Sequence, residues 1–400
     1  MLKNLRPAAK NAIMLGGMCC LSYLAVYIVR NVLSAVTPSL ISNGIFSETQ
    51  IGTLSSVYFI AYAVGQLING IIGDKIKAKY MISAGLVLAG IFGIVFVILR
   101  EQTWAAIAVY AFTGFLLSMV YAPMTKVVAE NTEPVHAERC SIGYTFASFF
   151  GSPVAGLLAG GLIWSGVFNV SGIILIMMGV LFFISFNIFE RKKVVQYNNY
   201  TRPKSEGGSV KVLFKRKIVK FTVVSIITGI VRTTVVFWMP TYFSQYLGFT
   251  PEQSANIFAV ATFVISFSAI IALMIYEKLG RNIDAVLFGS FIISAVCFLA
   301  LFIVRSPVFN ICIFILAVLA SNSATTMLWS VYCPSLKDTG VISSATGFLD
   351  FASYIAAAVS TNLFANAVNS IGWGNLILIW FGLMVVGVLI SLPLKKKTQV

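Results

Sequence analysis

Three charged side chains lie deep inside long apolar segments of this chain: Arg30, Arg232 and Asp350. A charge at the centre of a membrane-spanning helix costs about 2.5–3.5 kcal/mol on insertion scales, so such a residue normally faces a cavity or a partner. Each guanidinium stays charged at physiological pH and presents planar, paired donors that suit phosphate or carboxylate. Because there are two arginines and one aspartate, a surplus positive charge remains. These residues predict an anion site, and a phosphate dianion satisfies two arginines better than a single carboxylate does.

Two simpler explanations exist for these charges: snorkelling to the membrane surface and an internal ion pair. Arg30 lies eight residues before Pro38, roughly 12 Å along a helix, and Arg232 lies twelve residues beyond Lys220, roughly 18 Å. Neither arginine therefore reaches water easily past lipid. Asp350 can neutralise one arginine in the empty protein but not both, so that pairing stays open.

Polar residues follow the same helical faces as the charges. Tyr23, Tyr27 and Arg30 fall at i, i+4 and i+7, which places them on one stripe of a helix. Most serines and threonines in membrane helices serve helix packing, so only convergence on the charged segments predicts an aqueous cavity. The other residues on such stripes are Ser34; Ser225 and Thr228; Asn322, Thr326 and Trp329; and Thr346, Ser353 and Tyr354.

The elements that position these residues are membrane-spanning helices. Hydrophobic residues make up 58% of the 400 positions and charged residues 10%, against about 25% charged in soluble domains. A helix needs roughly 20 apolar residues to cross the hydrocarbon core, and about twelve segments qualify. The apolar runs do not alternate as barrel strands would. The predicted spans are 13–40, 50–73, 80–99, 104–129, 141–165, 167–189, 219–246, 254–276, 284–304, 308–333, 341–367 and 373–394.

The location of the basic residues predicts topology rather than nucleic-acid binding. With the N-terminus in the cytoplasm, 24 of the 28 Lys and Arg residues fall on the inner side, and only Arg100 and Arg305 fall outside. This distribution follows the positive-inside rule and places both termini in the cytoplasm. The net charge of +15 is then explained by contact with anionic lipid headgroups.

The chain divides into two halves that carry a weak internal repeat. A hydrophilic linker at 190–218 separates a six-helix bundle at 1–189 from a second at 219–400. Ile-Val-Arg at 28–30 recurs at 230–232, and later proline and acidic positions follow in the same order. We therefore expect a parallel duplication with a site near the midplane of the membrane, between the halves.

The segment between the second and third spans resembles the loop signature of the major facilitator superfamily. Residues 70–79 read Gly-Ile-Ile-Gly-Asp-Lys-Ile-Lys-Ala-Lys, and residues 276–281 of the second half read Tyr-Glu-Lys-Leu-Gly-Arg. Lys77 and Ala78 replace the usual glycine and basic residue, which the second copy keeps. The resemblance implies the all-α major facilitator fold, with twelve helices in two halves. It also implies a gating or loop-anchoring role, left open between the two, for Asp74, Lys75, Glu277 and Lys278.

A second pattern resembles the organophosphate:phosphate antiporter family. The matching motifs are Ser22-Tyr23, Tyr27 and Val29-Arg30-Asn31 in the first span, and Arg232 followed by Trp238-Met239-Pro240-Thr241-Tyr242 in the seventh. The resemblance implies that Arg30 and Arg232 bind a phosphoryl group. It also implies that the cavity is lined by Tyr23, Tyr27, Tyr62, Tyr121 and Tyr354.

This chain departs from that family at several of these positions. A bacterial member of that family has a histidine at the position of Ser148 and a lysine at the position of Gln66. Asp350 stands where that member has a small residue. The substrate and any proton coupling are therefore open: Asp350 contacts a cationic or hydroxyl part of a different organophosphate, or it titrates.

These observations together predict a secondary transporter that moves a small phosphate-bearing anion by alternating access, in exchange for inorganic phosphate. One alternative is a proton- or sodium-coupled symporter of organic carboxylates, which Arg232 disfavours. The other is a membrane sensor of sugar phosphate. We expect no enzymatic activity, no cofactor and no metal, because the sequence has no metal-ligand spacing and no phosphate-cradling glycine loop. The expected form is a monomer in the bacterial inner membrane.

Overall fold

A computed structural model describes residues 7–73, 76–196, 213–214, 216–304, 306–336 and 342–392. The described residues are almost entirely helical, and no strand occurs among them. Helices satisfy their backbone hydrogen bonds internally, as a lipid environment requires. Most of the linker predicted at 190–218 lies outside the described residues.

The described helices confirm the predicted spans. Eleven of them are long and apolar enough to cross a membrane. The last of the eleven contains Gly372 in a non-helical conformation, with φ at 76° and ψ at 168°, so it comprises the two spans predicted at 341–367 and 373–394. The helices that carry single spans without interruption are α1 (Pro7–Ser42), α2 (Glu48–Gly73), α3 (Ala78–Ile98), α8 (Trp164–Arg191) and α14 (Ile283–Ile303), and α17 (Ile342–Ser391) carries the last two.

The other spans are interrupted helices, which hydropathy alone does not reveal. Two of them contain a π-helical turn, and three contain a short break. They are α4 (Thr103–Leu117) with α5 (Tyr121–Asn131), α6 (Pro134–Phe149) with α7 (Gly151–Gly161), α10 (Ile218–Gly229) with η2 (Ile230–Val235) and α11 (Val236–Gln245), α12 (Pro251–Ser266) with α13 (Ser268–Lys278), and α15 (Pro307–Thr326) with η3 (Met327–Tyr332) and α16 (Cys333–Ser335).

One predicted boundary is displaced. The sequence places the turn between the fifth and sixth spans at 165–167, but α7 ends at Gly161 and α8 begins at Trp164. The turn residues Leu162 and Ile163 are apolar, so hydropathy continues through them. Ile163 is nevertheless 75% exposed. An apolar residue in a turn therefore prevents hydropathy from locating that turn.

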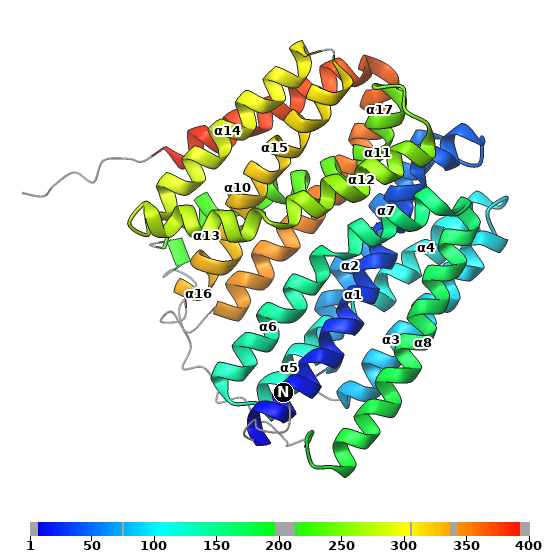
Figure 1. Cartoon of the computed structure of the whole chain (residues 1–400), viewed down its shortest axis with the longest axis vertical. Helices are drawn as coiled ribbons and strands as arrows, with labels where there is room; N and C mark the ends of the chain where they lie inside the picture. The colour runs from blue at the N-terminus through cyan, green and yellow to red at the C-terminus, as the bar shows by residue number, and fades with distance from the viewer. Residues whose placement is uncertain are drawn as a thin grey trace, which may run out of the picture. The chain divides into compact units, whose positions relative to one another are not determined.

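The helices form two units, coloured along the chain from blue to red in Figure 1. The first unit holds residues up to Thr201 together with Gly248–Phe263, and the second holds Arg202–Leu247 and Val264 onward. Gly248–Phe263 groups with the first unit because Gly156 of α7 lies against Ala255 and Ala259 of α12. The division into bundles at 1–189 and 219–400 stays a prediction.

Glycines set a close helix contact in the first unit, where α3 and α8 pack along their length. A methyl group at Gly90 would lie 2.5 Å from the carbonyl oxygen of Gly172, and one at Gly172 would lie 2.8 Å from that of Gly90. Backbone atoms cannot rotate away as side chains can, so the two helices approach to a distance that only glycine permits.

We expect Gly90→Ala to lower the free energy of unfolding by about 1–3 kcal/mol, the usual cost of overpacking. Gly93→Ala is the matched control, because it lies one turn away with no atom within 4 Å of the added methyl. That change should be neutral or slightly stabilising, since alanine favours helix over glycine. Denaturation of both variants in detergent measures the difference, and equal stabilities would show that the glycine contact does not set the packing.

The second unit is built around α17, which packs against α10 and α14. Its core holds Trp380, whose ring lies 5.6 Å from that of Phe314 on α15. Near the same end, the Tyr242 hydroxyl donates to Asn310 Oδ1 at 2.6 Å, which ties α11 to α15. These contacts join the seventh, tenth and twelfth spans, and the seventh and tenth carry two of the polar stripes predicted for this half.

Candidate anion-binding site

Arg30 lies inside an aromatic cage in the first unit. Its guanidinium carbon is 5.2 Å from the centre of the Tyr27 ring, 5.4 Å from that of Phe59 and 5.1 Å from that of Tyr62. Rings within about 6 Å attract a cation through their quadrupole. Tyr27 lies one turn before Arg30 on α1, and the other two rings come from α2. The cage places the guanidinium within the helix bundle.

A cluster of tyrosines extends from this cage. Tyr23 has its ring 4.9 Å from that of Tyr27, 5.5 Å from that of Tyr121 and 5.9 Å from that of Tyr144. Tyr121 and Tyr144 in turn lie 6.3 Å apart. Of the predicted tyrosines, Tyr27 and Tyr62 therefore lie beside Arg30, and Tyr23 and Tyr121 belong to the cluster that extends from Tyr27.

Close helix packing fixes this cluster. A methyl group at Gly151, where α7 begins, would lie 2.5 Å from both the backbone carbon and the Cβ of Tyr27. On the other side of the cage, the ring of Tyr58 lies 6.3 Å from that of Tyr62 and 5.0 Å from that of Tyr110. The cage residues are thus held in place from α7 and α4 as well as by their own helices.

In the second unit, Arg232 lies within the π-helical segment η2. Such segments are rare and often occur at functional sites, because the wider turn shifts side chains relative to an α-helix. The segment is anchored to α17: Thr234 Oγ1 donates to the Ala357 carbonyl at 3.0 Å and lies 2.8 Å from Ser360 Oγ. Arg232 therefore projects from a distorted turn that is fixed to the eleventh span.

Further contacts define the register between α10 and α17. Ser225 Oγ donates to the Leu349 carbonyl at 2.7 Å, and Gly229 lies directly against Ser353. In these pairs, and in the pair of Thr234 with Ala357, the two residue numbers differ by a nearly constant amount. The two helices therefore run parallel. The predicted polar stripe of the seventh span is partly wrong at Ser225, because its hydroxyl packs against α17. Asp350 and Tyr354 lie on α17 within this contact region.

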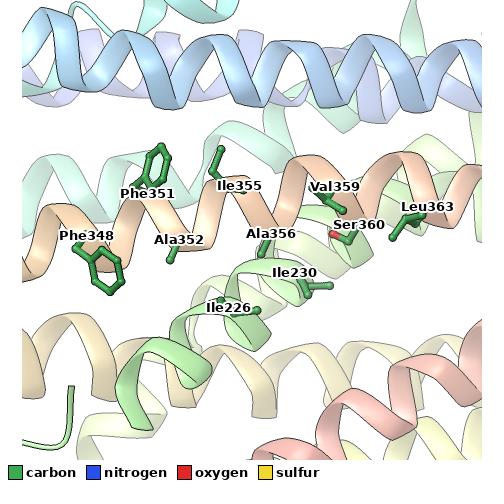
Figure 2. A pocket seen from close by; sticks show the side chains of 10 residues that line it. All are labelled: Ile226, Ile230, Phe348, Phe351, Ala352, Ile355, Ala356, Val359, Ser360 and Leu363. Carbon is green, nitrogen blue, oxygen red and sulfur yellow. The ribbon is translucent and has the colours of Figure 1, made fainter. Parts of the chain in front are cut away.

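An apolar groove of about 490 Å³ lies along one side of the same helix pair. Figure 2 shows the side chains that line it. Ile226 and Ile230 line it from the seventh span, and the remaining lining residues come from α17. Ser360 is its single polar residue among those lining it. None of the predicted site residues lines this groove, so it is not the anion site.

The remaining predicted residues are placed as follows. Ser148 is buried on α6, one turn after Tyr144, and Tyr354 is buried on α17. Glu277 and Lys278 are exposed at the end of α13. Asp74 and Lys75 lie outside the described residues. In the part of the chain that the structure describes, no group of three or more His, Cys, Asp or Glu side chains has the arrangement of a metal site.

Sequence analysis missed the residues Phe59, Tyr58, Tyr110 and Tyr144 around the cage. The spacing of Tyr58 and Tyr62 at i and i+4 was available as a signal that both lie on one face of α2. No sequence signal marked Tyr144, because its neighbours are brought close only by the packing of α6 against α1.

Comparison with known proteins identifies a family and several relatives. The family model described as Major Facilitator Superfamily matches residues 19–361. The phosphoglycerate transporter protein of Salmonella typhimurium is 26% identical over 88% of this chain and 82% of its own length. The glycerol-3-phosphate transporter of Bacillus subtilis is 24% identical over 58% of each chain, and the membrane sensor protein UhpC of Escherichia coli is 30% identical over 24% of this chain and 21% of its own.

Solved structures share the fold at low sequence identity. A bacterial homolog of the human lysosomal transporter Spinster has a TM-score of 0.75 and 13% identity, over 97% of this chain and 94% of that one. A D-xylose-proton symporter has a TM-score of 0.73 and 14% identity, over 95% and 97%. These similarities concern the fold alone.

Proposed function

We propose that this chain, which belongs to the major facilitator superfamily, is a secondary transporter that exchanges a small organophosphate for inorganic phosphate. The observation that carries the proposal is the Arg30 guanidinium held among three aromatic rings inside a membrane-spanning bundle. Two relatives, which match 88% and 58% of this chain, are named for phosphoglycerate and glycerol-3-phosphate, which are both phosphate esters.

The cage suits phosphate for a physical reason. Aromatic rings attract the positive charge of the guanidinium, and the N–H donors of an arginine lie in one plane. Those donors form a fork that matches two phosphate oxygens. The hydroxyls of Tyr27 and Tyr62 can add further donors at the edge of the cage. Arg232 is proposed as the matching ligand from the second half, at the equivalent position of the sequence repeat.

Alternating access completes the proposed mechanism. Without a ligand, permanent positive charges within the spans oppose occlusion, because a desolvated charge is costly. A bound dianion cancels them and permits the transition, so transport in one direction requires an anion for the return. The cavity residues in this proposal are Arg30, Arg232, Tyr23, Tyr27, Tyr62, Tyr121, Ser148, Asp350 and Tyr354, and the gating residues are Asp74, Lys75, Glu277 and Lys278.

The chain is an integral membrane protein. Its proposed setting is the bacterial inner membrane, with both termini in the cytoplasm, because the basic residues concentrate in the loops assigned to that side. It acts there as a monomer on a small anion, with membrane lipid around it and without nucleic acid. Membership of a transporter family supports a role that is not enzymatic.

Exchange predicts a strict dependence on the anion inside the vesicle. We expect labelled phosphate to enter proteoliposomes loaded with phosphate about tenfold faster, or more, than proteoliposomes loaded with chloride, because empty arginines block the return step. Uptake driven by a pH or sodium gradient without internal phosphate would instead identify a symporter.

A sensor is the second candidate, and the match to the sensor protein UhpC favours it over part of the chain. The same vesicles separate the two functions when binding is measured alongside flux. A phosphate ester that raises thermal stability but produces no flux in either direction would favour the sensor.

A further inference from the structure

The turn that precedes the seventh span is fixed in place against the tenth span. The Arg216 amide donates to the Leu213 carbonyl at 3.1 Å, and the Lys217 amide donates to the Phe214 carbonyl at 3.2 Å. The Tyr332 hydroxyl, at the end of η3, donates to the Arg216 carbonyl at 3.0 Å. The backbone of this turn is therefore held both by its own hydrogen bonds and by a side chain 116 residues away in the sequence.

The contacts behind the turn are closely packed. The ring of Tyr332 stacks on that of Phe221, with the ring centres 3.5 Å apart and an angle of 12° between the planes. Leu213 is buried. Lys217 adopts a left-handed conformation, with φ at 59°, and α10 begins at the next residue. The side chains that this turn directs outward are thus presented from a fixed support.

The outward side of the turn combines apolar and basic side chains. Phe214 is 65% exposed and Val219 is 58% exposed, and Arg216 and Lys217 are exposed between them. We call these four residues the entry patch, because the membrane-spanning segment Ile218–Gln245 begins here. Aromatic and basic residues exposed together are typical of segments that lie in the headgroup region of a membrane.

The entry patch carries a net positive charge. Asp284 Oδ2 lies 3.0 Å from Lys217 Nζ, and Asp284 Oδ1 lies 2.9 Å from Lys220 Nζ. One carboxylate therefore faces two ammonium groups, so one positive charge of this group remains. Arg216 adds another, because no carboxylate pairs with it in the part of the chain that the structure describes. The patch is thus electrostatically complementary to an anion.

We propose that the entry patch binds an anionic phospholipid, with the lipid phosphate on Arg216 and Lys217 and the start of the acyl chains against Phe214 and Val219. A soluble anion would satisfy the two cations but leave the aromatic ring in water, which costs free energy. A phospholipid satisfies both parts, because its charged and apolar regions adjoin at the depth where a span begins. The fixed backbone favours a defined site, since a rigid surface loses little entropy on binding. This inference does not depend on which anion the protein transports.

The test measures the thermal stability of the full chain, purified in a neutral detergent, during titration with phosphatidylglycerol or with zwitterionic phosphatidylcholine. A ligand that binds the folded protein raises its melting temperature. For the wild type we expect phosphatidylglycerol to act at a concentration about tenfold lower, or more, because each basic residue near an anionic headgroup adds to the attraction. The patch variant Arg216→Gln/Lys217→Gln should lose this preference. Arg216→Gln alone, which leaves both contacts of Asp284 in place, should reduce the preference about fivefold.

Lys192→Gln/Lys193→Gln is the matched control. It removes two exposed basic charges at the end of α8, but the apolar residues that follow, Val194 and Val195, are buried. This control should keep the wild-type preference. An equal loss in the control and in the patch variant would overturn the defined site, as would a wild type that responds equally to the two lipids.

Inorganic phosphate separates a lipid headgroup from a free ion as the partner of the patch. In the same titration without lipid, we expect phosphate to shift the melting temperatures of the wild type and the patch variant equally. A shift by phosphate that the patch variant loses would identify a site for the free ion and overturn the lipid inference. The comparison holds even if phosphate also binds elsewhere in the protein, because only the difference between the two proteins is used.

Discussion

Arg30→Lys is expected to reduce phosphate exchange by at least about two orders of magnitude while the protein still inserts and folds. Removing one partner of a desolvated charged contact typically costs 2–5 kcal/mol, and 1.4 kcal/mol corresponds to a factor of ten. Lysine keeps the positive charge but lacks the planar fork that binds two phosphate oxygens, and its compact ammonium fills less of the space among the rings of Tyr27, Phe59 and Tyr62. Initial rates of labelled phosphate exchange in proteoliposomes measure the effect.

A matched control is Arg100→Lys. Arg100 also lies beside an aromatic ring, 5.9 Å from that of Trp164, but its side chain is 42% exposed in the loop before α4. Its replacement should leave the exchange rate unchanged. The comparison therefore tests whether the effect of an Arg-to-Lys change depends on the position of the arginine in the protein. Arg232→Lys should match Arg30→Lys. Wild-type exchange in either variant would remove that arginine from the phosphate site.

The cage also shows why part of this site follows from sequence and part does not. The stripe of Tyr23, Tyr27 and Arg30 depends only on the period of one helix, and the structure places these residues together. Phe59 reaches the guanidinium from α2, and nothing in the sequence fixes how α2 rotates against α1. Contacts between helices depend on packing of the entire bundle, so periodicity cannot supply them.

The seventh span shows a different limit. The spacing of Ser225, Thr228 and Arg232 assumes 3.6 residues per turn throughout, and η2 departs from that value over Ile230–Val235. The π-helical turn is stabilised by contacts such as that of Thr234 with Ala357, more than a hundred residues away in the sequence. A local rule therefore predicts that the span is helical, but it does not predict the π-helical turn that sets the direction of Arg232.

The basic residues at the start of α3 show a third limit, because they look alike in sequence. The positive-inside rule treats Lys77 and Lys79 equally, and the former is exposed as expected. Lys79 is instead only 6% exposed. Its Nζ lies 2.6 Å from Glu190 Oε2 and 2.9 Å from Asn187 Oδ1, both near the end of α8. Lys77 is thus exposed, whereas Lys79 joins α3 to α8.

This difference predicts the second large effect. Lys79→Met should lower the free energy of unfolding by about 3–5 kcal/mol, because it leaves Glu190 as a partly buried charge without its cation. Glu190 Oε1 is already buried with no hydrogen-bond partner among the described residues, so little can compensate. Lys77→Met, two residues away, removes an exposed charge and should change stability by less than about 0.5 kcal/mol. Unfolding of the purified protein in detergent with increasing denaturant measures both.

The double variant Lys79→Met/Glu190→Met separates the ion pair from simple packing. When both charges are removed, no uncompensated carboxylate remains, and replacing a buried ion pair by apolar groups is often neutral or stabilising. We therefore expect the double variant to recover most of the stability that Lys79→Met loses, which is a large coupling energy in a double-mutant cycle. Additive losses would mean that each side chain acts alone and that the α3–α8 contact depends on its glycines rather than on this pair. Recovery would show that this ion pair holds the start of α3 against the end of α8, next to the loop signature.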